Sequence, residues 1–153
     1  MSRVVGADAA LHAALEDGPD GLVVVALPQP AGPVGAMATD DLAALVDAAL
    51  LPAFRALREE RDRAVIVCPA SAVLPDHRDG ARSVVAAGLA MLGEVASAAA
   101  PVNVVAVADD VPAADIAAAV RFALTTPSLN GATIRLDGGR DAVLAAVTRS
   151  EED

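Results

Sequence analysis

The chain of 153 residues contains no lysine, no tyrosine and no tryptophan. All 11 of its basic residues are arginines, and only Phe54 and Phe122 are aromatic. A mechanism that needs a phenol or a primary amine on a side chain is therefore excluded. Any hydrophobic core must be built mainly from Ala, Val and Leu, which dominate the 55% apolar content.

Cysteines and long hydrophobic runs are also scarce. Cys68 is the single cysteine, so no disulfide can form within the chain. No apolar stretch approaches the roughly 20 residues that cross a bilayer, and the first residues lack the layout of a signal peptide. We therefore expect a cytoplasmic protein without a membrane partner.

Acidic residues outnumber basic ones, and the formal net charge is −10 at pH 7. A field of this sign repels phosphate backbones and anionic lipids, which argues against binding to nucleic acid or to a membrane surface. The high aliphatic content nevertheless predicts a folded domain rather than a disordered chain.

Short β-branched runs alternate along the chain with Ala/Leu-rich stretches. This alternation is typical of α/β domains with a mostly parallel sheet. We predict one domain over residues 1–153, a truncated Rossmann-like three-layer sandwich with a sheet of about five strands. The expected strands cover residues 3–7, 22–27, 64–68, 102–107 and 133–137.

Helix starts are marked by residues that favour caps or first turns. Asp8 precedes a short helix, Thr39 and Asp79 precede two long ones, and Pro112 lies in the first turn of a fourth. Pro52 falls within the first long helix, so we expect a kink or a new helix start there.

The two long helices are apolar around most of their circumference, so each must be buried on more than one side, although the sheet can cover only one. In the first, Leu51 and Phe54 lie off the main apolar stripe. In the second, another stripe runs beside the main one and consists of Val84, Gly88, Met91 and Val95.

One long Pro/Gly-rich loop spans residues 28–38. It connects a strand to a helix at the carboxyl end of the sheet, where ligands bind in open α/β folds. Near the end of the chain, residues 141–150 have the composition of a last helix.

Four stretches resemble the short-chain dehydrogenase/reductase (SDR) family. "EVASAAAPVNVVAVADDV" (94–111) is similar to the end of that family's active-site helix and the next strand, and "GATIRLDGG" (131–139) to its last strand and turn. "DGLVVVALPQPAG" (20–32) resembles the strand that normally ends in Asn-Asn-Ala-Gly, and "AVIVCPASAV" (64–73) the strand that delivers the catalytic serine. The resemblance implies an SDR-like domain that lacks the N-terminal dinucleotide-binding strand and Gly-rich turn.

The same resemblance implies that the family's chemistry is lost. That chemistry needs a tyrosine activated by a nearby lysine, together with a bound nicotinamide. We therefore predict a pseudoenzyme with no catalytic, cofactor-binding or metal-binding residue, inactive on its own. At the family's functional positions the chain has Ala26–Gln29 for Asn-Asn-Ala-Gly, Ala49 for the Asn, Ala70 for the Ser, His77 for the Tyr and Ala81 for the Lys.

In the SDR family the two long helices pack against the same helices of a second subunit. The resemblance thus implies a noncatalytic subunit of an oxidoreductase complex, which assembles with an intact SDR partner and stabilises it or shapes its active site. NAD(P) would bind to the partner. An obligate interface of this kind buries on the order of 2,000 Å² or more. Its candidate residues are Leu51, Phe54, Val84, Gly88, Met91, Val95, Leu136, Asp137, Gly138 and Gly139.

The expected strand order also bears on this interface. Connections that step in one direction across a sheet, with right-handed crossovers, place their helices on one face. We therefore expect part of the other face, and one sheet edge, to lack cover.

Two other functions stay open. One is a homodimeric small-molecule binding module without redox activity, which would use residues 28–38 as a pocket lid. The other is an enzyme of unrelated chemistry built on His77, Asp109 or Asp110.

Three further residues have simpler interpretations. Ser71 is not surrounded by the elbow motif of a nucleophile, which argues against a triad of Ser71, His77 and Asp79. His12 and Cys68 are expected to be ordinary packed side chains.

Overall fold

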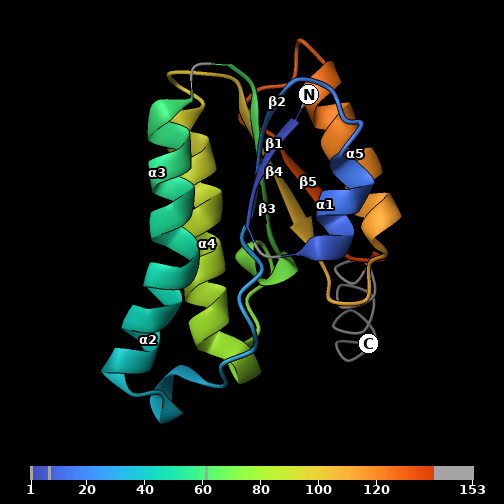
Figure 1. Ribbon diagram of the computed structural model, residues 1–153. Helices are drawn as coiled ribbons and strands as arrows, with labels where there is room; N and C mark the ends of the chain where they lie inside the picture. The colour runs from blue at the N-terminus through green and yellow to red at the C-terminus, as the bar shows by residue number, and fades with distance from the viewer. Residues whose placement is uncertain (1, 7, 61, 140–153) are drawn as a thin grey trace, which may run out of the picture.

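The computed structural model describes residues 2–6, 8–60 and 62–139 (Figure 1). Five strands form one parallel sheet in the order β1-β2-β3-β4-β5, which confirms the expected strands and fold class. The strands are β1 (Ser2–Val5), β2 (Gly21–Val25), β3 (Ala64–Pro69), β4 (Val102–Val107) and β5 (Thr133–Leu136). The α-helices are α1 (Ala9–Leu15), α2 (Thr39–Leu45), α3 (Leu51–Glu59), α4 (Gly80–Ala96) and α5 (Ala113–Thr125).

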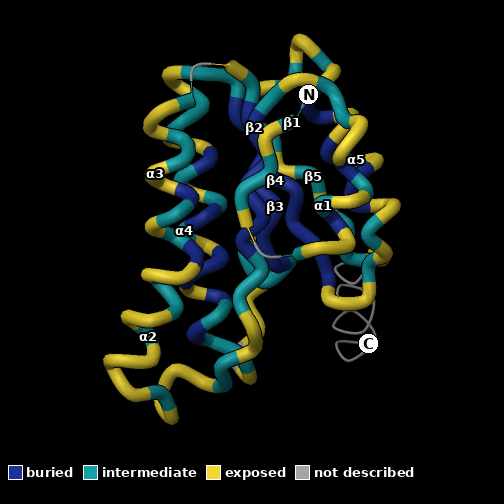
Figure 2. Tube along the Cα trace, in the orientation of Figure 1, coloured by how far each residue is buried: buried dark blue, intermediate teal, exposed yellow. Residues whose placement is uncertain are grey.

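Helices cover both faces of the sheet, so the domain has three layers (Figure 1). α3 and α4 pack on one face, in a core that includes Ile66 and Leu89. α1 and α5 pack on the other face, in a core that includes Leu11, Val65 and Val120. Every residue of the two central strands, β3 and β4, is buried (Figure 2).

The position of α1 and α5 corrects one expectation. Because successive strands step in one direction, crossovers of a single hand would place all helices on one face. The connections through α1 and α5 instead pass over the face opposite α3 and α4, so the two pairs of crossovers differ in hand. The second face is therefore covered, contrary to the expectation of an open one.

The helices begin close to the residues predicted from the sequence, but the predicted roles of two of these residues are wrong. The Asp8 carboxylate accepts a hydrogen bond from the Leu11 amide at 2.9 Å and caps α1 as expected. Thr39 is the first residue of α2 rather than its cap. Pro112 immediately precedes α5 rather than lying in its first turn.

Pro52 interrupts the first long helix without breaking it. A π-helical turn at Val46–Leu50 joins α2 to α3, and the Leu51 amide bonds to the Val46 carbonyl. Proline has no amide hydrogen and its ring crowds the carbonyl four residues earlier, which accounts for a wider turn just before it. The helix expected over residues 141–150 lies outside the described residues.

Gly93 marks the closest approach of α4 to the sheet, since a Cβ at this position would lie 2.6 Å from Val104 Cγ2. We expect Gly93→Ala to lower the free energy of unfolding by about 1–2 kcal/mol, because overpacking outweighs the gain in helix propensity. In the matched control Gly88→Ala, the new Cβ would lie 3.6 Å from Leu50 Cδ2. That variant should be neutral or stabilised by about 0.5–1 kcal/mol. Urea unfolding followed by circular dichroism compares them, and equal stabilities would contradict this packing.

Candidate functional site

A hollow of about 630 Å³ opens at the carboxyl ends of the strands. Pro69, Ala70 and Ser71 line it after β3, and Asp109 follows β4. The wall is formed by the segment before α4 and by the start of that helix. This is the end of the sheet at which ligands bind in open α/β folds.

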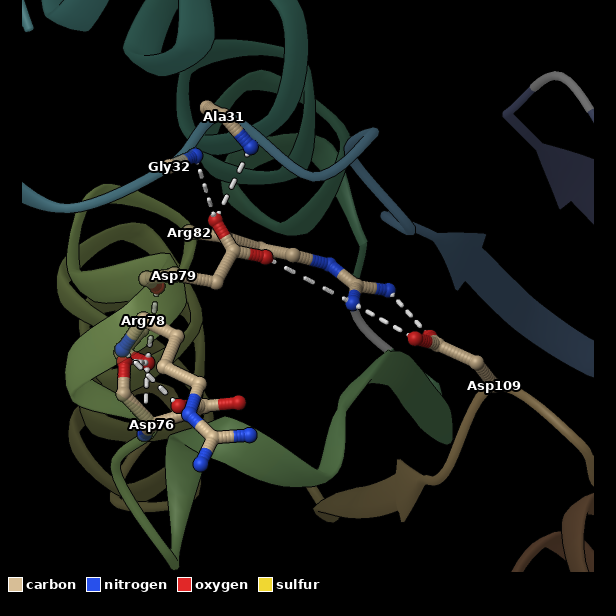
Figure 3. Close-up of polar contacts among 8 residues, drawn as sticks. Ala31, Gly32, Asp76, Arg78, Asp79, Arg82 and Asp109 are labelled. Atoms are coloured by element: carbon tan, nitrogen blue, oxygen red, sulfur yellow. Dashed lines mark hydrogen bonds and ion pairs between the residues drawn. The ribbon is translucent and has the colours of Figure 1, made fainter.

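Arg82, in the first turn of α4, is the centre of the polar contacts in this hollow (Figure 3). Its Nη2 lies 2.6 Å from Asp109 Oδ1 and its Nη1 lies 3.1 Å from Asp109 Oδ2, a two-pronged pair. Asp79 Oδ2 lies 3.8 Å from the same Nη1. The Arg82 side chain is only 12% exposed, whereas that of Asp109 is 69% exposed, so water screens the carboxylate of this pair.

Asp79 also holds the Pro/Gly-rich loop. Its Oδ1 accepts hydrogen bonds from the amides of Ala31, at 2.9 Å, and Gly32, at 3.2 Å (Figure 3). The carboxylate is therefore occupied by the loop instead of capping α4, which it precedes. One side chain thus ties residues 28–38 to α4 and, through Arg82, to the end of β4.

Two buried polar atoms in the hollow have no hydrogen-bond partner among the described residues. They are Ser71 Oγ and Arg82 Nε. Ser71 therefore does not bond to Asp79, which agrees with the sequence argument against a triad that includes both residues. His77 lies in a 3₁₀ turn, His77–Asp79, directly before α4.

Three of the residues at the expected positions of the SDR functional groups are buried alanines. Ala26 is 5% exposed, Ala49 4% and Ala81 1%. Each fills space against neighbouring apolar groups, and none offers a polar atom beyond the backbone. These three positions, which the SDR resemblance aligns with polar groups, therefore hold buried apolar side chains in this chain.

Asp109 and Cys68, two further residues considered in the sequence, have surroundings that explain them without catalysis. Asp109 is paired with Arg82, and no group of three or more His, Cys, Asp or Glu suited to a metal occurs among the described residues. Burial raises the pKa of the Cys68 thiol to about 12. Its thiolate is therefore scarce at neutral pH, as expected for a packed side chain.

The turn between β1 and α1 is short and internally bonded. Gly6 has φ +132°, and a Cβ there would lie 2.2 Å from the Val25 carbonyl oxygen, so the turn is pressed against β2. His12 Nε2 lies 3.0 Å from the Gly6 carbonyl oxygen. Asp8 caps the amide at the helix start. His12 thus closes a local turn, in keeping with its expected structural role.

Leu51, Phe54, Val84, Met91 and Val95 are large apolar residues of α3 and α4 that are exposed to solvent, and we call the surface they form the helix face. A shallow groove of about 240 Å³ runs between the ends of the two helices, lined by Phe54, Leu92 and Val95 among others. Gly88 is half-buried, close to Leu50. The exposed fractions are 36% for Leu51, 49% for Phe54, 58% for Val84, 58% for Met91 and 65% for Val95.

The other predicted interface residues, 136–139, lie at the end of β5, which is an edge strand of the sheet. Leu136 is half-buried at the end of β5 and packs against the α1–α5 core. Asp137 pairs with Arg135 at 3.0 Å and accepts a hydrogen bond from the Gly139 amide at 2.9 Å. Gly138 and Gly139 have φ +66° and +76°, a conformation that favours glycine. The helix face and residues 136–139 are thus two separate surfaces.

Solved structures with the same fold are dehydrogenases. A small-chain dehydrogenase in complex with NADPH is 19% identical, with a TM-score of 0.69 over 85% of this chain and 78% of its own. The apo SCOR enzyme from Clostridium thermocellum is 16% identical, with a TM-score of 0.68 over 78% of this chain and 62% of that enzyme. The chain folds as a short-chain dehydrogenase does.

Acetoin dehydrogenase from Enterobacter cloacae has the same SDR fold, at 16% identity and a TM-score of 0.64 over 85% of this chain and 68% of its own. No known sequence family and no curated protein matches the chain. Because the chain spans only 62% of the SCOR enzyme's length, the likeness concerns architecture and not activity.

None of the described helices is long and apolar enough to cross a membrane.

Arg82 was not among the site residues predicted from the sequence. The available signal was its spacing, three residues after Asp79 on a helix, which favours an ion pair.

The tether between Asp79 and the loop gives a direct test. Asp79→Ala removes the acceptor of two amides, and we expect the Ala31 and Gly32 amides to exchange faster with solvent, with stability lower by about 1–2 kcal/mol. Asp79→Asn keeps an oxygen in the same place and should retain most of the protection. Amide exchange followed by NMR measures both. Unchanged exchange in Asp79→Ala would show that the loop is held by other contacts.

Proposed function

We propose that the chain is a noncatalytic SDR-like subunit that assembles with an intact NAD(P)-dependent SDR partner and stabilises it or shapes its active site. The helix face is the observation that carries this proposal. Large apolar side chains on a folded domain are costly to leave in water, and a patch of them marks an interaction surface. Leu51, Phe54, Val84, Met91 and Val95 form such a patch on two adjacent helices.

The turn after β1 supports the noncatalytic part of the proposal. Dinucleotide-binding folds use a Gly-rich turn whose free amides and helix N-terminus hold the pyrophosphate. Here residues 6–8 connect β1 to α1, and the Asp8 carboxylate already takes the Leu11 amide. A carboxylate at that position repels a phosphate. These residues do not fit a dinucleotide, and NAD(P) is assigned to the partner.

The chemistry of the hollow supports the same interpretation. The sequence has no tyrosine and no lysine, and Ala49 and Ala81 fill core positions where an SDR enzyme has polar groups. Arg82, whose side chain is only 12% exposed, lies next to two carboxylates, those of Asp79 and Asp109. The hollow thus contains an ion-pair cluster that links the loop, α4 and the end of β4.

Purification from the protein's own host tests the proposal. Native mass spectrometry of a tagged chain should reveal a stoichiometric second polypeptide that has the SDR Gly-rich turn and the Tyr/Lys pair. Met91→Arg places a charge on the helix face and should abolish recovery of that partner. Glu16→Arg, an exposed position at the end of α1 on the opposite side of the sheet, is the matched control and should retain it. Recovery of this chain without any second polypeptide would contradict the proposal.

The hollow favours one second candidate, a homodimeric small-molecule binding module. Its volume, about 630 Å³, falls within the range of ligand pockets. Residues 28–38, tethered by Asp79, would form its lid. A small molecule that is retained by the chain alone, and lost in Asp79→Ala, would favour this candidate over the subunit.

A further inference from the structure

The hollow at the carboxyl ends of the strands contains an arginine whose hydrogen-bond donors are only partly used. The Arg82 guanidinium carries five N–H groups. Asp109 accepts a hydrogen bond from each of its two Nη atoms, and Asp79 lies 3.8 Å from Nη1, an ion-pair distance (Figure 3). Arg82 Nε is buried and has no hydrogen-bond partner among the described residues. Because buried polar groups in folded proteins are nearly always paired, this N–H indicates a further acceptor.

A second buried polar atom with the same need lies after β3. Ser71 Oγ also has no partner in the described part of the chain. Ser71 belongs to the 3₁₀ turn Ala70–Ala72, which packs against α4, and both Ser71 and Arg82 line the hollow. A guanidinium can only donate and a hydroxyl can also donate, so a hydrogen-bond acceptor satisfies both groups.

Asp109 shows which kind of acceptor fits Arg82. Its two carboxylate oxygens lie 2.6 and 3.1 Å from the two Nη atoms, the two-pronged geometry of a planar carboxylate on a guanidinium. The Asp109 side chain is 69% exposed, so water weakens its hold on Arg82. Asp109 also leaves Nε unused. A carboxylate that is not attached to the chain can take the place of Asp109 and accept hydrogen bonds from Nε and one Nη together.

The rest of the lining restricts what carries that carboxylate. An apolar wall is formed by Pro30, Pro69, Leu74, Pro75 and Val107. It favours an aliphatic body, since apolar surface is stabilised by burial. Four aspartates line the hollow against two arginines, namely Asp76, Asp79, Asp109 and Asp137 against Arg78 and Arg82. One negative charge on the ligand is matched by Arg82, whereas a second would be repelled by the aspartates.

We propose that the hollow binds a small aliphatic monocarboxylate, whose carboxylate replaces that of Asp109 on Arg82 and whose chain lies against the apolar wall. Asp109 is then an internal competitor that occupies the arginine until the ligand binds. The volume of about 630 Å³ accommodates a molecule of this kind. The inference rests on the second candidate function, the binding module, for which it names the class of ligand, and it requires no partner enzyme.

Titration of the full chain with butyrate, followed by ¹H–¹⁵N NMR, tests this exchange. We expect saturable binding with a dissociation constant on the order of 1 mM. Asp109→Asn removes the competing charge while keeping the shape of the side chain, so it should tighten binding on the order of threefold, the size expected for a solvent-screened ion pair. Asp47→Asn makes the same charge change at an exposed position outside the hollow and should leave the affinity unchanged.

Two further samples test the arginine and the charge of the ligand. Arg82→Lys keeps a positive charge in the hollow but lacks the planar fork, so it should weaken butyrate binding about tenfold. Butyramide has nearly the same shape as butyrate without its charge, and should bind the wild type about tenfold more weakly or less.

Butyrate binding that is tightened in Asp109→Asn and weakened in Arg82→Lys supports the inference. A wild type without saturable butyrate binding would overturn it, and so would an affinity that Asp109→Asn lowers or leaves unchanged. Equal binding of butyrate and butyramide would overturn the carboxylate ligand but leave the binding module in place. The subunit proposal is tested separately, by the partner recovered from the host.

Discussion

The complete burial of β3 and β4 is the constraint on which the rest of the structure depends. Every residue of these strands is buried, and their backbones pair on both sides within the sheet. Strands without a polar face must be covered above and below, which requires a helical layer on each face. α3 and α4 form one layer, and α1 and α5 form the other although this reverses the hand of two crossovers. Coverage of the core thus outweighs the usual preference for one hand.

The same constraint explains the character of the candidate site. A core of Ala, Val, Leu and Ile has no hydroxyl or amine to present at the carboxyl ends of the strands. The charged groups that pair there come instead from the residue before α4, the first turn of α4 and the segment after β4, namely Asp79, Arg82 and Asp109. Arg82 pairs with both carboxylates, and Asp79 also accepts hydrogen bonds from the amides of Ala31 and Gly32, so these charges link the loop, α4 and the end of β4. The SDR-like fold is present, and these three charged groups contact one another and the loop.

Much of this could be predicted from the sequence because the relevant signals are local. Uninterrupted β-branched runs predicted the buried strands, Asp8 the first helix cap, and the extra apolar stripes the exposure of Leu51 and Met91. The covering of the second sheet face could not be predicted in this way. The face on which a crossover helix packs depends on contacts between segments far apart in the sequence, which a local pattern does not encode. The link from Asp79 to Ala31 joins residues 48 positions apart, and it depends on how the loop folds back over α4.

A titration with NADH and NADPH tests the central claim most directly, namely that this chain has the SDR fold without a cofactor site of its own. The chain has no tryptophan and no tyrosine, so protein fluorescence interferes little with that of the nicotinamide. The account predicts no saturable change in nicotinamide fluorescence and no rise in melting temperature with either nucleotide. Saturable binding of either nucleotide to the isolated chain, at one site per subunit, would contradict it.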